Sequence, residues 1–182
     1  MQMVKEEITS ALLNRDIAFD LLRRLKVPYN VRRHSLRVTE KALEIADRIT
    51  KAKVDKNLIE VGAILHDIGR SKTHGFQHAL VSGRILRERG FPDEVARICE
   101  THILGGLDSE DAKSVGLPEK DFIPKTIEEK IVCLADKLIS GRREVSIKER
   151  FEIWFRKYGQ TKILQKAKQR IETIQKEIED LM

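Results

Sequence analysis

Residues 61–70 read VGAILHDIGR, an apolar run that ends in a histidine followed directly by an aspartate. The run has the spacing of a helix, which we expect over residues 56–67. His66 and Asp67 would be the last residues of this helix, and Gly69 suits the turn after it. An imidazole beside a carboxylate offers ligands that suit Zn, Mn, Fe or Ni. The stretch therefore predicts one corner of a metal site, provided that other ligands can reach it.

The rest of the chain has the same helical periodicity, and no long alternation of apolar and polar residues predicts a strand. We therefore expect an all-α fold. Four residues are expected to cap helices, two of them in capping boxes that end in a glutamate three positions later. These are Asn30, Asp55, Thr126 with Glu129, and Ser146 with Glu149. The other helices are expected at about 3–13, 16–26, 31–50, 76–89, 92–103, 108–115, 127–140, 146–158 and 160–181.

The 182 residues fit one domain, and 41% of them are hydrophobic, enough for a core. No stretch approaches the roughly 20 apolar residues of a membrane span, and the N-terminus lacks an apolar signal segment. These features predict a cytoplasmic protein without a membrane partner. Cys99 and Cys133 stand among apolar helix residues and are expected as buried thiols. The net charge of +6 is spread along the chain and only 5% of residues are aromatic, so nucleic acid is possible but not favoured as a partner.

Polar groups recur on the apolar faces of other predicted helices. His34, His78 and His102 each lie on such a face, and Asp136 stands among apolar neighbours. Burying these groups without partners costs free energy, so several buried together need a common reason. One divalent ion would satisfy them. His74 precedes a helix and is expected as an exposed loop residue.

The order His34, then His66-Asp67, then Asp136 resembles the HD-domain superfamily of metal-dependent phosphohydrolases, in its HDIG variety. The similarity covers roughly residues 30–145. It is carried by the segments RHSLRVTEKALEIA, VGAILHDIGR, HALVSGRILRERGFPDEVARICETHI and EEKIVCLADKL.

The resemblance implies a single HD-type domain over 1–182, with a core at about 30–145 and a C-terminal helical extension at 146–182. It implies one or two divalent ions (Mn, Fe, Ni, Zn or Mg), the first of them held by His34, His66, Asp67 and Asp136. His78 and His102 match the positions of a second ion in two-metal members, where Asp67 would bridge the two ions. Several relatives have paired histidines where this chain has Thr101 before His102. If the second ion is absent, these two histidines would form hydrogen bonds with phosphate oxygens or water instead.

The implied reaction is hydrolysis of a phosphomonoester or phosphodiester in a small nucleotide-like molecule, with Asp67 as the catalytic residue that orients the attacking water. Basic side chains would offset charge on the phosphoryl oxygens. The candidates for substrate binding are Arg70, Lys72, Lys137 and Arg142, with Arg143 next to them. The long segment 104–125 could form a wall or lid.

Two other functions remain open. The chain could be a phosphodiesterase acting on RNA ends or cyclic nucleotides, or a non-catalytic module that senses nucleotides or binds a partner. Within 160–181, apolar residues at spacings of three and four form a narrow seam. The seam is expected to pack back on the domain or, alternatively, to pair with a second chain in a homodimer.

Overall fold

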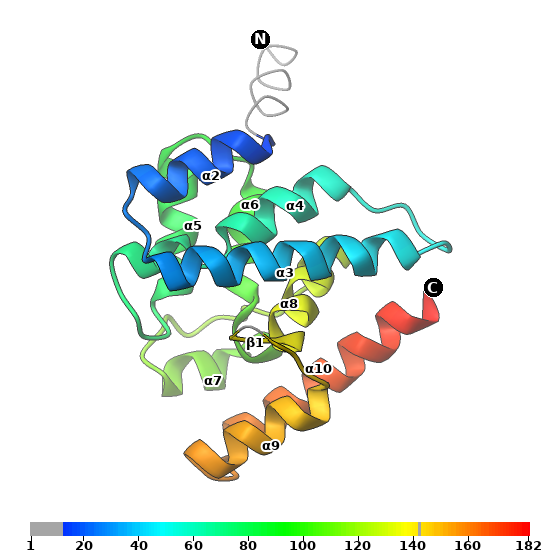
Figure 1. Ribbon diagram of the computed structural model, residues 1–182. Coiled ribbons are helices and arrows are strands. Elements are labelled where there is room, and N and C mark those ends of the chain that lie inside the picture. The colour runs from blue at the N-terminus through cyan, green and yellow to red at the C-terminus, as the bar shows by residue number, and fades with distance from the viewer. Residues whose placement is uncertain (1–12, 142) are drawn as a thin grey trace.

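The computed structural model describes residues 13–141 and 143–182, and these ranges are mostly helical (Figure 1). The helix expected over 3–13 falls almost wholly outside them, as does the candidate Arg142. The α-helices are α2 (Arg15–Arg24), α3 (Tyr29–Arg48), α4 (Lys56–Leu65), α5 (His78–Glu88), α6 (Asp93–Thr101), α7 (Ser109–Ser114), α8 (Ile127–Leu138), α9 (Ile147–Tyr158) and α10 (Lys162–Asp180). Two 3-10 turns, η1 (Ile68–Ser71) and η2 (Ile103–Gly105), and an antiparallel pair of two-residue strands, β1 (Ile139–Ser140) and β2 (Arg143–Glu144), complete the set. The predicted all-α fold is confirmed.

Three of the four expected helix caps are present, and the fourth is wrong. The side chains of Asp55, Thr126 and Ser146 accept hydrogen bonds from the backbone N–H groups three residues ahead. Asn30 caps nothing, because α3 already begins at Tyr29 and its N-cap is Pro28. Side-chain caps satisfy N–H groups that a helix leaves unpaired at its start, which is why they mark helix starts in a sequence so well.

Helix α4 ends earlier than expected, and the structure needs a glycine at position 69 for a different reason than ending the helix. The helix ends at Leu65, His66 follows as its C-cap, and the chain then turns through η1. Gly69 does not take the left-handed conformation of a helix-ending glycine. A Cβ atom on it would lie 2.1 Å from the carbonyl oxygen of His78, so glycine is needed here because η1 and α5 touch backbone to backbone.

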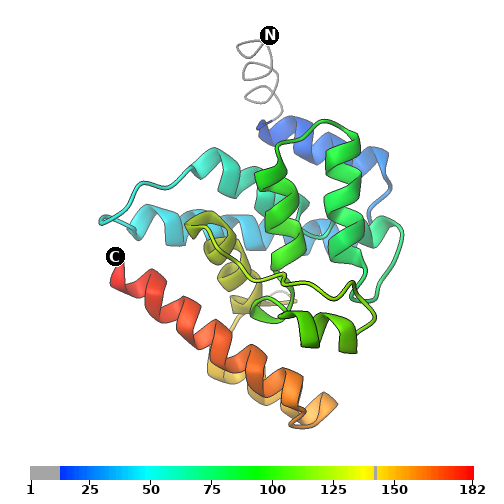
Figure 2. The ribbon, with the colours of Figure 1, turned by 180° about the vertical axis from the view of Figure 1, so that it is seen from behind.

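The core lies around α3, which packs against α4 and α8, while α5 and α6 run side by side and lie toward the viewer in Figure 2. One hydrophobic cluster joins α3, α4 and α8 to the C-terminal helices, and a second lies among α2, α4, α5 and α6. Cys99 and Cys133 are fully buried, as expected. Burial raises the pKa of both thiols, that of Cys133 to about 11, so both are neutral core side chains.

The C-terminal seam packs on the chain's own core. Its members on α10 are all buried in the first hydrophobic cluster: Leu164, Ala167, Ile171, Ile174 and Ile178. In Figure 1, α9 and α10 lie together below α8. Of the two expectations for the seam, packing against the domain is the one observed, and the apolar face of α10 is not left open for a second copy.

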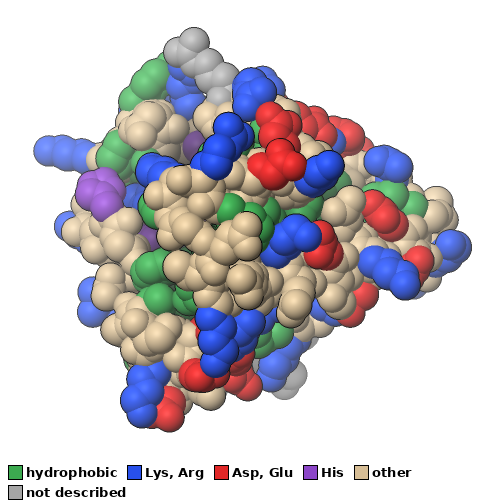
Figure 3. Space-filling model, turned by 90° about the horizontal axis from the view of Figure 1, so that it is seen from below, with side chains coloured by type: hydrophobic (Ala, Val, Ile, Leu, Met, Phe, Trp, Pro, Cys, Tyr) green, Lys and Arg blue, Asp and Glu red, His purple; other side chains and the backbone are tan. Residues whose placement is uncertain are grey.

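Among the described residues, no helix combines the length and the hydropathy needed to cross a bilayer. Figure 3 views the face on the side of α9 and α10, where acidic and basic side chains are interspersed. That mixture is typical of a solvated surface rather than of a phosphate-backbone track.

An ionic cluster fastens α10 to the segment that holds α7. Asp108 Oδ2 lies 2.5 Å from Lys166 Nζ and 2.6 Å from Arg170 Nη2. Asp111 contacts the same two basic groups. Desolvation would raise the pKa of Asp108, but the hydrogen bond from Lys166 and the nearby Arg170 outweigh it and lower that pKa to about 2.

We expect Asp108→Asn to lower the melting temperature at pH 6 but not near pH 2. A carboxyl whose folded pKa is below its ordinary value of 3.8 stabilises the fold above about pH 4, and this contribution disappears as the pH falls through 2. The Asp108 side chain is 35% exposed, so the loss at pH 6 should be about 0.5–1 kcal/mol. Thermal unfolding at pH 6, 4 and 2.5 measures it, with Asp20→Asn in an exposed helical pair as the control. A deficit that stays constant across these pH values would contradict the assignment.

Candidate metal centre and adjoining pocket

Six polar side chains from five separate helical segments meet at one point in the core. Each comes from an end of a helix or from the residue just beyond it, except those on α3 and α8, which project from within the helix. The six are His34 on α3, His66 and Asp67 after α4, His78 at the start of α5, His102 after α6, and Asp136 on α8. All six candidate ligands from the sequence are therefore brought together.

Asp67 lies between three of the imidazoles. Its Oδ1 is 2.9 Å from His78 Nε2 and 3.7 Å from His102 Nε2. Its Oδ2 is 3.7 Å from His66 Nε2. A carboxylate with one oxygen facing each side has the arrangement that two neighbouring ions would share.

Asp136 closes the opposite side of the cluster. Its Oδ1 accepts a hydrogen bond of 2.8 Å from His34 Nε2 and lies 3.7 Å from His66 Nε2. Three sets of three ligand atoms lie within 4.8 Å of one another: His34, His66 and Asp67; His66, His102 and Asp136; and Asp67, His78 and His102. The sets overlap, so one or two ions could be accommodated.

Backbone carbonyls fix the orientation of three imidazoles. The Nδ1 atoms of His66, His78 and His102 each lie 2.7 Å from the carbonyl oxygen three residues earlier, those of Ala63, Gly75 and Cys99. A carbonyl can only accept, so each Nδ1 carries a proton, and in the neutral ring Nε2 then presents a lone pair to the centre. This is the orientation that hydrogen bonds behind a metal ligand impose.

The lone pairs that converge there lack enough protons to satisfy one another. His66 Nε2 is buried without a hydrogen-bond partner. The Nε2 atoms of His78 and His102 are 3.3 Å apart, yet with both Nδ1 atoms protonated neither Nε2 can donate to the other. A cation is the group that such a donor set accommodates, and nitrogen with carboxylate oxygen suits a borderline divalent metal.

The local electrostatics keep four of the six candidate ligands, His66, His102, Asp67 and Asp136, in the protonation states that metal binding needs, and His34 is the exception. Burial lowers the pKa of His66 and lowers that of His102 further, so both rings are neutral near pH 7. Burial alone would raise the pKa of Asp67 and Asp136, but the histidines around Asp67, and Lys137 with His34 beside Asp136, hold both well below the usual range. Burial opposes protonation of His34, yet its hydrogen bond to Asp136 raises its pKa overall.

The four basic candidates for substrate binding differ in where they lie. Arg70 Nε is 2.7 Å from Asp67 Oδ2, at the edge of the centre. Lys137 is buried, and its Nζ contacts Asp136 and donates to the carbonyl oxygen of His102 over 2.8 Å. Lys72 is exposed and does not line the pocket described below, and Arg142 lies outside the described residues. Roles for these four in binding substrate stay predictions.

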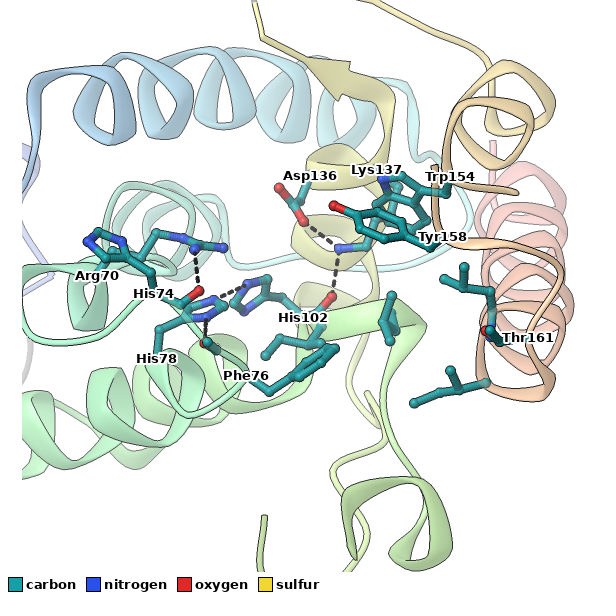
Figure 4. A pocket seen from close by; sticks show the side chains of 15 residues that line it. Arg70, His74, Phe76, His78, His102, Asp136, Lys137, Trp154, Tyr158 and Thr161 are labelled. Atoms are coloured by element: carbon teal, nitrogen blue, oxygen red, sulfur yellow. Dashed lines mark hydrogen bonds and ion pairs between the residues drawn. The ribbon is translucent and has the colours of Figure 1, made fainter. Parts of the chain in front are cut away.

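A pocket of about 520 Å³ opens directly onto the centre (Figure 4). In this view Asp136, Lys137, Trp154 and Tyr158 form one wall, and the loop bearing Phe76 lies across from them. The complete lining is Arg70, His74, Gly75, Phe76, His78, His102, Ile103, Leu104, Asp136, Lys137, Trp154, Tyr158, Thr161, Ile163 and Leu164. A cleft of this size suits a small organic ligand.

The sequence did not reveal which segments form the pocket walls. From the segment 104–125, only Leu104 lines the pocket, because a backbone bridge between Leu107 and Phe122 closes the segment on itself. The wall comes instead from the end of α9 and the start of α10. A tryptophan and a tyrosine four residues apart in a chain poor in aromatics were the available signal. His74 is exposed, as expected, and lies at the rim.

Comparison with known proteins identifies the fold and the family. The solved HD domain of the phosphodiesterase PgpH from L. monocytogenes, in complex with cyclic-di-AMP, superposes with a TM-score of 0.52 at 20% identity, over 89% of this chain and 95% of that one. An uncharacterised protein of Methanocaldococcus jannaschii is 49% identical over 120 residues, 65% of this chain and 71% of that protein.

A second match covers only part of a longer enzyme. The tRNA (cytidine(56)-2'-O)-methyltransferase of Picrophilus torridus is 40% identical over 149 residues, which cover 82% of this chain but only 41% of that protein. The family model described as HD domain matches residues 31–141, more than half of the chain. The chain therefore belongs to the HD domain family.

Proposed function

We propose that the protein is a metal-dependent phosphohydrolase that cleaves a phosphomonoester or phosphodiester in a nucleotide-like small molecule. The observation that carries this proposal is the convergence of four imidazoles and two carboxylates, with His66 Nε2 buried and unpaired. Three of the six, His78, His102 and Asp136, line an open pocket. A site made only for stability would satisfy its buried polar atoms within the protein. This site instead presents ligand atoms to the pocket.

His34, His66, Asp67 and Asp136 would hold one divalent ion, and His78 with His102 would hold a second or contact phosphate. Such an ion, when bound, acidifies water near neutral pH and polarises a phosphoryl oxygen. Asp67, whose pKa is held well below its usual range, would accept a hydrogen bond from the attacking water and aim it at phosphorus.

Arg70 would offset negative charge on the phosphoryl oxygens, and Lys137 would orient the Asp136 carboxylate. The Arg70 guanidinium lies at the pocket edge with its Nε on Asp67, so its outer nitrogens can donate to a phosphoryl oxygen as charge develops there. Lys137 Nζ is held between Asp136 and the carbonyl oxygen of His102, which keeps the Asp136 carboxylate oriented. Both side chains therefore act where they already lie, without a conformational change.

A phosphodiester substrate has specific support from the relatives. The PgpH HD domain is that of a phosphodiesterase and was solved with a cyclic dinucleotide. Ribonuclease Y of Acidothermus cellulolyticus is 29% identical over 91 residues, 49% of this chain and 15% of that protein. These likenesses favour an activity on cyclic nucleotides or RNA ends as the second candidate. A non-catalytic nucleotide sensor would use the same centre without turnover.

Metal analysis of the purified protein, combined with a phosphate-ester screen, tests the proposal. The screen should include nucleoside monophosphates, cyclic nucleotides and short RNA, with and without EDTA, and with His66→Ala as the blank. We expect a stoichiometric transition metal and turnover of at least one ester that EDTA abolishes and Mn²⁺ restores. Binding of nucleotides without any turnover would favour the sensor, and turnover that survives EDTA would exclude the proposed mechanism.

A further inference from the structure

Aromatic side chains gather at the mouth of the metal-centre pocket. The chain has one tryptophan, two tyrosines and six phenylalanines, and the pocket takes the tryptophan, one tyrosine and one phenylalanine. Tyr158 is 57% exposed and Phe76 is 38% exposed. Large exposed aromatic side chains at the entrance of a cleft are typical of a surface that binds a ligand.

The tryptophan is held rigidly on α9. The Arg150 guanidinium lies over the Trp154 ring, 5.4 Å from its centroid, and Phe151 meets the indole at 83° with centroids 5.1 Å apart. Arg150 is itself buried and donates from Nε to the carbonyl oxygen of Lys137 over 2.8 Å. Since Lys137 follows the candidate ligand Asp136, the same arginine fixes the distance from the indole to the metal centre.

The aromatic side chains adjoin the charged groups of the pocket. Figure 4 shows Trp154 and Tyr158 on the side of Asp136 and Lys137, with Phe76 across the opening. Ile163 and Leu164 continue the wall toward α10. The pocket therefore offers cation-binding and phosphate-compensating groups beside flat hydrophobic faces.

We infer that Trp154 and Tyr158 form a stacking wall for the base of a nucleotide whose phosphate lies at the metal centre. The inference rests on the proposed function, which does not say what part of the substrate is recognised. We expect the aromatic base to decide which phosphate esters bind. Every base has a π-face, and stacking on an aromatic side chain is tolerant of base identity. The wall is thus expected to select nucleotides over base-free sugar phosphates while discriminating weakly among bases.

The single tryptophan makes the test direct, because all tryptophan fluorescence comes from Trp154. The protein is titrated in the same Mn²⁺ buffer with adenosine 5'-monophosphate and, separately, with ribose 5-phosphate. We expect saturable quenching by the nucleotide and at least tenfold weaker or no quenching by the sugar phosphate. Tyr158→Leu should raise the Kd for the nucleotide by about tenfold, within the range measured for loss of one stacking partner.

Tyr29→Leu is the matched control, since Tyr29 is the other tyrosine, is 66% exposed and lines a second cleft, which His34 also borders, outside the pocket of Trp154 and Tyr158. It should leave the Kd unchanged. Equal affinity for the two ligands, or equal effects of the two tyrosine variants, overturns the inference even if the ester screen finds metal-dependent turnover. Quenching by the nucleotide with no turnover of any ester supports the stacking wall and removes only the proposed hydrolysis.

Discussion

Asp67→Asn is expected to lower kcat on the best substrate of the ester screen by about 1,000-fold, equivalent to ~4 kcal/mol of transition-state stabilisation. The side chain keeps its size, but it loses the negative charge that His66, His78 and His102 surround. It also loses the strong acceptor that would orient the attacking water. Affinity for the nucleotide should fall much less, because the stacking wall and Arg70 remain. Steady-state kinetics and the tryptophan titration measure the two effects separately.

The control for this variant is Asp47→Asn, the same chemical change in a surface pair with Lys56. It should leave kcat and metal content unchanged. Metal content of Asp67→Asn should also be measured, since losing a shared carboxylate weakens binding of the ion as well as the reaction. If Asp67→Asn turns over within tenfold of the parent protein at saturating metal, Asp67 is not the residue that orients water.

The six candidate ligands could be recognised from the sequence because each is a polar group in an apolar, helical context. Asp136 stands among Val132, Ala135 and Ile139, which are all buried, and a carboxylate in such company needs a counter-charge. Helical periodicity also predicted the helices themselves, since amphipathic spacing and side-chain caps are local properties. Their roles as metal ligands remain predictions that metal analysis tests.

The pocket walls could not be predicted because they depend on contacts between distant segments. Trp154 reaches the centre only because the β1–β2 turn reverses the chain after α8 and Arg150 then bonds to the carbonyl oxygens of Lys137 and Ile139. Ser140-Gly141 is a local turn signal, and Gly141 has a φ of 60°, but the local sequence does not show which distant residues the reversed chain then contacts. The segment 104–125 is predicted as a wall or lid because its length is visible in the sequence. The ionic cluster that ties it to α10 is formed with distant residues and is not visible there.

Gly69 shows the same limit. The sequence predicts Gly69 in the turn after α4, where it lies in η1, but not the close approach between two segments that carry candidate ligands. Gly69 N donates to Ser82 Oγ over 2.8 Å, and Ser82 Oγ in turn lies 3.3 Å from the carbonyl oxygen of His66. The backbone contact of η1 with α5 thus sets how far Asp67 lies from His78.

Gly69→Ala is therefore expected to destabilise the protein by about 3 kcal/mol, because overpacking against backbone cannot be relieved by moving a side chain. The added Cβ would lie 2.1 Å from the carbonyl oxygen of His78 and 2.8 Å from Ser82 N. For a chain of this size the melting temperature should fall by roughly 6–12 °C. Metal affinity should fall too, since α5 must shift and take His78 with it.

Gly75→Ala provides the matched control, because Gly75 lies three residues before the start of the same helix, on the exposed rim of the pocket. Its Cβ would approach only the Gln77 side-chain oxygen, at 2.7 Å, and that flexible group can move aside. Its effect on stability should stay within about 0.5 kcal/mol of zero, the usual range for a surface change. Thermal unfolding of both variants, with and without Mn²⁺, separates packing from metal binding. If the two variants have the same melting temperature, then η1 and α5 can separate at little cost in free energy. The spacing of Asp67 and His78 would then be maintained by the metal-ligating side chains and not by the backbone.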